Sequence, residues 1–431
     1  MGVMRRLLFV AVLAVLAMGA TSFAAEQTIP PGTIITMRNW QQYTAFMPDG
    51  MKDLFAGKYF WKMPPDFQMV VGPFHDFPPP KEYIEDTKKY AGHVQIINFP
   101  DGRHSIKGYV AGLPFPNPQA PQKGYKILVD EWYFYFPHIL CGPIVSRLLD
   151  RFGNRYDVTA LLVLRRHSYV SDYKTPVDDP SFPGVYTTYY LGLIAPEQAK
   201  YLAQLTVYYT DPAKLNDLFM FIPALRRTLR LSTGARCAPW AGTDWIQDDT
   251  RLGGWNGGIT NVEVKFLRMQ NILSFVYAPD PKVWADWDNF YPRLFLPKPI
   301  VGKWEVRPVY VIDVRRDPAM QKNYCLGKRI QYLDKETFVP LWNDLYDKQM
   351  KLWKMLPYLS PAVPIPHEGV QINSQNMITG IYDVQNDHLT WSITNMNGQY
   401  VKGNEDCRNH MGRDFTTSLY DTVSGLSEIM R

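Results

Sequence analysis

Short runs of β-branched and aromatic residues dominate the pattern of apolar positions along this chain. Most runs are bounded by Pro, Gly, Asp or Asn and joined by short connections, which is typical of β-strands. They occupy residues 126–136, 160–167, 185–193, 201–209, 262–266, 273–277, 304–314, 324–333 and 388–394. Many strands in succession, without regular intervening helices, predict a large antiparallel sheet, so we expect a mainly β (α+β) fold.

Two further segments are compatible with the same sheet. Residues 225–231 alternate with period two, which fits a strand better than a helix. In residues 332–354, side chains such as Trp342 and Leu345 can share one helical face, yet the turn-like Asp347-Lys348-Gln349 separates two arms that fit strands. A helix and a β-hairpin therefore both remain open for this segment.

The first part of the chain has a different character. Residues 26–124 are rich in Pro, Gly and aromatic residues, and a short helix is predicted at residues 81–90, directly after three prolines. Residues 112–121 contain several prolines, each of which removes a backbone donor, so this stretch reads as an extended linker. We expect residues 26–124 to pack on a main body of antiparallel sheet formed by residues 125–431.

The first 25 residues have the three parts of a secretory signal. Arg5 and Arg6 precede an apolar run at residues 7–18, and small residues follow up to Ala25. The run is short for a membrane span, and no later stretch approaches the roughly 20 apolar residues that a spanning helix needs. We expect cleavage near Ala24 or Ala25 and a periplasmic protein with no transmembrane segment, the alternative being a retained N-terminal anchor.

Composition narrows the function classes. The formal net charge of +5 is dispersed along the chain, whereas nucleic-acid binding favours a concentrated basic face, so no nucleic acid is expected. The 12 Trp, 27 Tyr and 22 Phe, together with 35 Pro, suit strands joined by stiff loops.

The four cysteines, Cys141, Cys237, Cys325 and Cys407, have neither CxxC nor Cys/His metal spacing. In an oxidising compartment they permit two disulfides, with the pairing left open. The eight histidines are scattered without an i, i+4 pair, so no metal site and no cofactor are predicted.

Motifs for catalysis are absent from the linear sequence. We find no G-x-S-x-G nucleophile elbow, no H-E-x-x-H, and no phosphate-binding glycine loop with its Lys and Ser/Thr. The glycine-rich stretch 253–258 is interpreted as a loop with Trp255 and Asn256 at its tip. A non-enzyme is predicted, with a hydrolase acting on an envelope lipid or glycan as an alternative that would need a spatially assembled site.

Aromatic side chains are the first candidate ligand-binding residues. The run Trp132-Tyr133-Phe134-Tyr135-Phe136 would present rings on both faces of its predicted strand. If one face packs on the core, the aromatic rings of the other face also need cover. Either both faces are buried in the ordinary way, or the second face lines an internal cavity for a lipid-like ligand. The residues assigned to that cavity are Trp132, Phe134, Phe136, Tyr189, Tyr208 and Trp255.

Charged residues are the second set. Arg226, Arg227 and Arg230 could bind an anionic headgroup, together with Asp244. The alternative is that these arginines pair with Asp244, Asp248 and Asp249 at the sheet surface.

Several motifs occur in the same order as in one bacterial family. They are Gly112-Leu-Pro-Phe-Pro, Pro223-Ala-Leu-Arg-Arg-Thr-Leu-Arg230, then Pro239, Gly242, Thr243, Asp244 and Asp248-Asp249, residues 310–314, Tyr332-Leu-Asp-Lys-Glu-Thr337, Tyr346-Asp347 and Leu352-Trp-Lys354. Together they resemble a widespread family of exported proteins of unknown function, described as outer-membrane lipoprotein-sorting-like.

The resemblance implies a curved antiparallel sheet that forms a half-barrel around a few helices, similar to the carriers LolA and LolB. In such carriers the Tyr-Leu-Asp-x-x-Thr pattern falls on a strand, so we choose the hairpin for residues 332–354. The implied function is a periplasmic carrier that shields a lipid or other hydrophobic molecule. An RND-class exporter and an outer-membrane protein are implied partners, which leaves a protein-docking component of an exporter complex as an alternative function.

Overall fold

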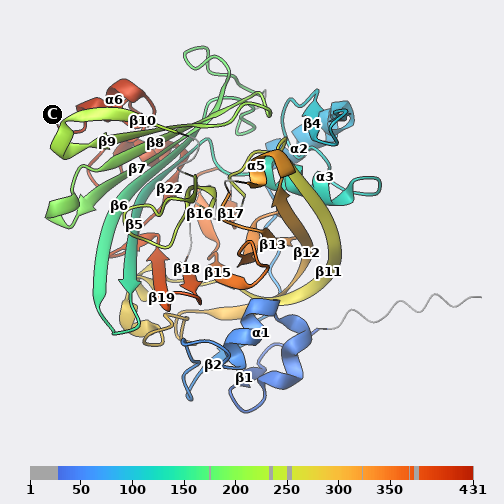
Figure 1. Cartoon of the computed structure of the whole chain (residues 1–431), viewed down its shortest axis with the longest axis vertical. Helices are drawn as coiled ribbons and strands as arrows, with labels where there is room; N and C mark the ends of the chain where they lie inside the picture. The colour runs from blue at the N-terminus through green and yellow to red at the C-terminus, as the bar shows by residue number, and fades with distance from the viewer. Residues whose placement is uncertain are drawn as a thin grey trace, which may run out of the picture.

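Antiparallel strands form most of the structure (Figure 1). The computed structural model describes residues 28–173, 176–232, 236–249, 255–322, 324–367, 369–372 and 378–430. The main strands are β5 (Ile139–Leu149), β6 (Arg155–Arg166), β7 (Val185–Ala195), β8 (Ala203–Tyr209), β9 (Asp217–Ile222), β10 (Arg227–Leu231), β11 (Val262–Tyr277), β12 (Lys303–Arg316), β13 (Lys328–Asp334), β14 (Pro340–Tyr346), β15 (Leu352–Leu359), β18 (Ile378–Asp383), β19 (His388–Ile393) and β22 (Lys402–Gly403).

These strands make one 14-stranded sheet. Their order is β10-β9-β8-β7-β6-β5-β19-β18-β15-β14-β13-β12-β11, with β22 beside β5. Within the described chain, β10 pairs only with β9 and β11 only with β12, so the sheet is open at both edges. It curves strongly, which confirms the predicted mainly β fold with a large curved antiparallel sheet.

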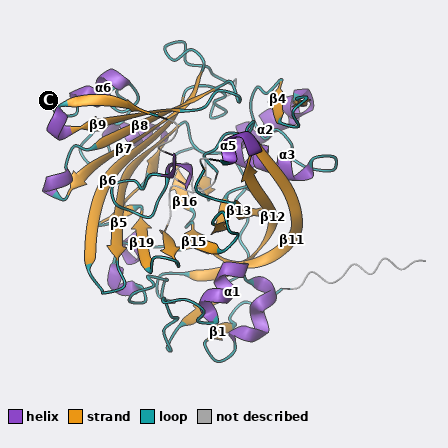
Figure 2. Cartoon of the chain, viewed as in Figure 1, coloured by secondary structure: helices purple, strands orange, loops and turns teal. Residues whose placement is uncertain are grey.

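The helices are short, and most of them lie at the margins of the sheet (Figure 2). They are α1 (Asp49–Phe55), α2 (Lys81–Tyr90), α3 (Lys123–Tyr133), α4 (Pro281–Trp284), α5 (Pro318–Gln321) and α6 (Val423–Glu428). The smaller two-stranded sheets pair β1 (Ile34–Thr36) with β2 (Gln68–Val70), β3 (Gln95–Asn98) with β4 (His104–Lys107), β16 (Val363–Ile365) with β17 (Gly369–Gln371), and β20 (Asn395–Met396) with β21 (Gln399–Tyr400).

Several local predictions are confirmed. The helix at residues 81–90 is α2, and residues 332–354 hold the ends of β13 and β15 with β14 between them, so the hairpin is correct. Residues 112–121 contain no strand, as their prolines indicate. The runs at 262–266 and 273–277 are parts of one strand, β11, which carries a bulge at Leu267.

The prediction of a strand at residues 126–136 is wrong. Residues 123–133 form α3, and an extended stretch follows from Phe134. All residues from Ile127 to Tyr133 are buried, including Asp130 and Glu131. A helix that is buried around its circumference does not need a polar face, so its run of aromatic residues resembles a strand in the sequence.

The sheet is covered on both faces. On the face that we call inner, α3 lies so close to β11 that a Cβ on Gly124 would sit 2.5 Å from the backbone nitrogen of Phe266. On the outer face, Cys407 and Phe415 of the C-terminal segment pack with Cys141 and Tyr190. The same hydrophobic core includes residues from 28–124 and from the main body, so the two regions share one interior.

Two disulfides fasten covering segments to the sheet. Cys141 of β5 is bonded to Cys407, and Cys237 is bonded to Cys325, which precedes β13. The expectation of two disulfides is confirmed, and the pairing that the sequence left open is thereby assigned.

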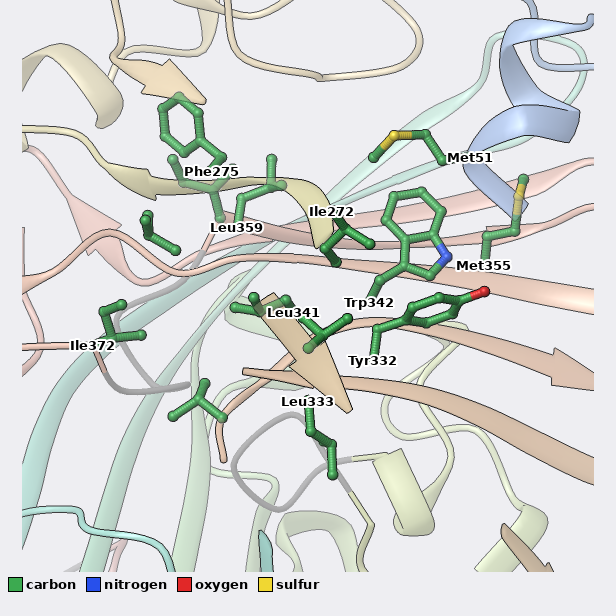
Figure 3. Close-up of a cluster of buried hydrophobic side chains, with 14 of the residues drawn as sticks. Met51, Ile272, Phe275, Tyr332, Leu333, Leu341, Trp342, Met355, Leu359 and Ile372 are labelled. Atoms are coloured by element: carbon green, nitrogen blue, oxygen red, sulfur yellow. The ribbon is translucent and has the colours of Figure 1, made fainter. Parts of the chain in front are cut away.

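A buried carboxyl lies where α1 meets the outer face. The Gly50 N–H donates to Asp344 Oδ2 at 3.0 Å, and Trp342 Nε1 donates to Oδ1 at 2.7 Å. Met51 of α1 gathers with Trp342 and Met355 at the same contact (Figure 3). Burial, together with the negative charges of Asp49 and Asp53, raises the pKa of Asp344 to about 7.

Stability should therefore fall as the pH rises from about 4 to about 7. The folded protein holds the Asp344 proton more tightly than the unfolded chain, in which the carboxyl titrates near 3.8, so this contribution is complete at acid pH and is lost through the folded pKa. The loss corresponds to at most about 4 kcal/mol. Urea unfolding between pH 4.5 and 8 should show a flatter pH dependence for Asp344→Asn than for the wild type, and equal slopes would contradict the assignment.

Candidate functional site

One irregular segment occupies the inner face. We call residues 236–249 the inner segment; it begins at Arg236, contains a 3-10 turn at Gln247–Asp249, and is buried from Thr243 to Asp249. In Figure 1 the yellow-green chain of this region runs inside the curve of the sheet. Gly242 has a φ of +79°, a left-handed backbone that glycine adopts without strain, and it turns the segment inward.

Asp244 fixes the middle of the inner segment to the sheet. Its Oδ2 lies 2.7 Å from His388 Nδ1 and accepts from the Thr390 hydroxyl at 2.8 Å, and its carbonyl accepts from Lys354 Nζ at 2.7 Å. The hydrogen bond with Asp244 raises the pKa of His388. Asp244 is thus a contact to β15 and β19, and it lies far from the arginines on β10 with which it was grouped in the sequence.

Two consecutive residues bridge distant strands. Gln247 accepts from Gln204 Nε2 at 3.1 Å and donates to the Thr206 hydroxyl at 3.3 Å, both on β8. Asp248 accepts from Arg316 Nη2 on β12 at 2.7 Å. In the strand order, β8 and β12 are nine spacings apart, or about 43 Å on a flat sheet. The curvature must therefore bring these two arms together, and the inner segment lies between them on the concave face.

We call the contacts of Gln247 with β8 and of Asp248 with β12 the bridge, and buried ion pairs stabilise it. Asp248 also accepts from Arg236 Nη1 at 2.7 Å and from the Tyr324 hydroxyl at 2.6 Å, and Asp249 pairs with Arg329 of β13. Burial alone would raise the pKa of Asp248, but the charges of Arg316 and Arg236 outweigh it and hold that pKa well below its ordinary value. The carboxylate is therefore ionised throughout the physiological range.

We call Asp248, Asp249, Arg236, Arg316 and Arg329 the charged cluster, and Trp255 packs against it. Its ring centroid lies 4.6 Å from the Arg316 guanidinium and 5.7 Å from that of Arg329. Its backbone N–H donates to Glu131 of α3 at 2.8 Å. The prediction that Trp255 and Asn256 form a loop tip is wrong, because both are buried; Gly253 and Gly254 lie outside the described residues.

Beside the charged cluster lies a small apolar groove. Ile144 and Leu191 line it together with Tyr189, and Trp240 and Trp245 of the inner segment cover it. The remaining cavity measures about 30 Å³ and is also lined by Ser146 and Asp249. That volume holds about one water molecule, so the two indoles already fill the groove.

The other predicted aromatic residues lie apart from this groove. Trp132 and Tyr208 pack edge to face at 6.1 Å and line a cavity of about 20 Å³. Phe134 and Phe136 are buried, and the Arg166 guanidinium covers the Phe136 ring at 4.0 Å. Of the six aromatic candidates, the structure brings Tyr189 to the groove and Trp255 to the charged cluster.

The arginines of β10 do not pair with the predicted aspartates. Arg226 and Arg227 are exposed at the sheet edge, and Arg230 pairs with Asp217. Arg230 also lines an open cleft of about 390 Å³ that reaches Arg236. The partners of Asp248 and Asp249 are Arg236, Arg316 and Arg329. These arginines come from a loop and from the ends of two strands, and no local motif marks them in the sequence.

A second, polar cleft of about 320 Å³ lies near the C-terminal segment. His138, Arg165 and Asp172 line it, and burial lowers the pKa of His138 to about 4. Among the described residues that line it there is no Ser or Cys, and the Thr416 hydroxyl donates to Asp414. This cleft can bind a polar group, and Glu405 and His367 also line it.

Within the described part of the chain, no group of three or more His, Cys, Asp or Glu side chains is placed to hold a metal ion. Nor does any helix within the same residues have the length and apolar character to cross a membrane. The proposed signal, residues 1–25, lies outside the described residues.

Comparison with known proteins identifies one family. The profile of the family described as "Protein of unknown function (DUF1329)" matches residues 34–418, which confirms the resemblance seen in the sequence motifs. No curated protein has significant sequence similarity to the chain.

Three solved structures are similar at low identity. A DUF1329 family protein from Desulfovibrio piger has 13% identity and a TM-score of 0.45, and covers 67% of this chain and 95% of its own. An outer membrane lipoprotein-sorting protein domain from Vibrio parahaemolyticus has 14% identity and a TM-score of 0.44, with 63% and 90% covered. A LolA superfamily protein from Nitrosomonas europaea has 11% identity and a TM-score of 0.38, with 63% and 90% covered.

The Asp248 bridge generates a stability prediction. Asp248→Asn leaves Arg236 and Arg316 buried without their anion, so we expect a loss of about 3–5 kcal/mol in the free energy of unfolding, measured by urea denaturation. The matched control is Arg151→Gln, which removes the surface pair with Asp387 and should cost less than about 1 kcal/mol. Equal effects of the two substitutions would show that the bridge does not hold the arms together.

Proposed function

Because this chain belongs to the DUF1329 family, whose activity is not established, we propose its function from its own geometry: a non-catalytic periplasmic carrier that shields a lipid or other hydrophobic molecule on the concave face of its sheet. One observation carries the proposal. The apolar groove on that face is covered by two indoles of an irregular segment rather than by a second layer of secondary structure.

The inner segment is an internal occupant of the groove, which a ligand must displace. Burial of a large apolar side chain contributes about 1.5–3 kcal/mol, so a ligand with a long apolar chain can compete with Trp240 and Trp245. The inner segment is held by side-chain contacts to the sheet, so it can leave without breaking the hydrogen bonds between strands. The inner segment is therefore the element that must move when a ligand enters.

The disulfide defines how the inner segment can move. Cys237 lies at its start and is bonded to Cys325, next to β13. Displacement of Trp240 and Trp245 therefore leaves the segment attached to the sheet at one end. Two disulfides also fit an oxidising compartment such as the periplasm, in agreement with the secretory pattern of residues 1–25.

A protein-docking component of an envelope exporter complex is the second candidate, and strand β10 favours it. β10 is an edge strand with Arg227 and Arg230 exposed, and α6 packs beside it through a Thr228–Ser427 hydroxyl contact of 2.8 Å. An exposed edge is a template for pairing with a strand of another protein. The same molecule could use β10 to deliver cargo to an exporter or outer-membrane protein.

The carrier proposal predicts a gain of ligand binding when the internal occupant is weakened. Trp245→Ala should bind the neutral probe N-phenyl-1-naphthylamine about tenfold more tightly than the wild type, because less apolar contact must be displaced. Probe fluorescence titrations measure this. Native mass spectrometry of gently purified wild-type protein should show a retained lipid mass.

The matched control is Trp391→Ala. Trp391 is also fully buried, but it packs with Tyr382 on the outer side of the sheet. A similar gain in both variants would mean that any large cavity binds the probe, which would contradict a role for the groove. Absence of probe or lipid binding in every variant would overturn the carrier proposal itself.

The docking alternative predicts contact at β10. A photo-crosslinking residue in place of Arg227 should capture an exporter component or outer-membrane protein in cells, identified by mass spectrometry of the adduct. The same residue in place of Phe152, which is 83% exposed in the turn between β5 and β6 and lies several strands away from the β10 edge, is the control. Identical adducts from both positions, or none from position 227, would exclude docking through this edge.

A further inference from the structure

The charges that meet on the concave face come from two different sources. Arg316 and Arg329 belong to neighbouring strands, β12 and β13, and both side chains are almost fully buried. Their carboxylate partners, Asp248 and Asp249, belong to the inner segment. The charges of Arg316 and Arg329 are therefore fixed in the sheet, whereas Asp248, Asp249 and the third arginine, Arg236, move with the segment.

Displacement of the inner segment would unbalance this site. A guanidinium removed from water needs an anionic partner, because burying an unpaired charge is costly. Glu131 of α3 faces the same region and accepts hydrogen bonds from Trp255 and from Gln331. With two arginines against one carboxylate, the exposed site retains a net positive charge.

The charged site is continuous with the apolar groove. Asp249 lines the groove with Tyr189 and Trp245, and the same carboxylate pairs with Arg329. The inner segment thus presents indoles to the apolar end and carboxylates to the cationic end, one next to the other. This is the chemical arrangement of an anionic amphiphile.

We propose that the ligand is an anionic amphiphile whose headgroup replaces the carboxylates of Asp248 and Asp249 at Arg316 and Arg329, while its apolar chain replaces Trp240 and Trp245. This inference rests on the carrier function proposed above and names its ligand class. A carboxylate and a phosphate share the chemistry that Arg recognises, since each offers oxygens that match the fork of guanidinium donors.

A series of ligands with one chain length tests the headgroup directly. Dodecanoate, dodecyl phosphate and dodecanol, each below its micelle concentration, are compared by displacement of N-phenyl-1-naphthylamine from the full-length mature protein. We expect each anion to bind about tenfold more tightly than dodecanol, the effect of one charge-assisted contact. The ratio between dodecanoate and dodecyl phosphate distinguishes a fatty-acid-like ligand from a phospholipid-like one.

Single substitutions test which residues cause the preference for anions over dodecanol. Arg329→Gln should reduce the difference between anion and alcohol to about twofold or less, whereas Arg151→Gln on the outer surface should keep it. Asp249→Asn should strengthen binding of the anions, because their internal competitor is removed. Where a variant does not fold, the ligand series on the wild-type protein still tests whether an anionic headgroup increases affinity.

The outcomes separate the two proposals. Equal affinity for dodecanol and the anions overturns the headgroup assignment and leaves the carrier function standing. No binding of any of the three compounds overturns the carrier function and, with it, this inference. A preference for anions that persists in Arg329→Gln and Arg316→Gln overturns the assignment to these two arginines.

Discussion

The bridge made by Gln247 and Asp248 is the constraint on which the concave architecture depends. Adjacent residues of one chain contact β8 and β12, strands that lie at opposite arms of the sheet. An open sheet of this size can twist and splay, whereas a buried ionic contact tolerates little change in distance. The bridge therefore fixes the curvature of the sheet. The curvature in turn sets the width of the groove and the position of α3 against β11.

The bridge also explains why so many polar groups lie in an aromatic-rich interior. Arg236, Arg316 and Arg329 are buried with their carboxylates, and Trp255 lies against two of the guanidinium groups. Replacement of such pairs by apolar side chains often stabilises a protein, so stability alone does not account for them. A site whose charges are needed by a ligand, and are satisfied internally in its absence, does account for them.

The sequence predicts the sheet well because period-two patterns and turn residues are local signals. β7 begins at Val185 as expected, and the hairpin of β14 and β15 follows its turn residues. α3 was missed because nearly all of its residues are buried, including Asp130 and Glu131, so it shows no exposed polar face. The charged cluster could not be predicted, since Asp248 meets Arg316 across 68 residues of sequence and only the curvature brings them together.

The Cys237–Cys325 disulfide has a consequence for unloading. A competitor tied to its own binding site acts at a fixed effective concentration, which for short flexible tethers is in the millimolar range. Such competition lowers the apparent affinity for cargo and cannot be diluted away. A transport protein of this design would hold its cargo only loosely, and reinsertion of the two indoles would drive the cargo out toward whichever acceptor lies nearest.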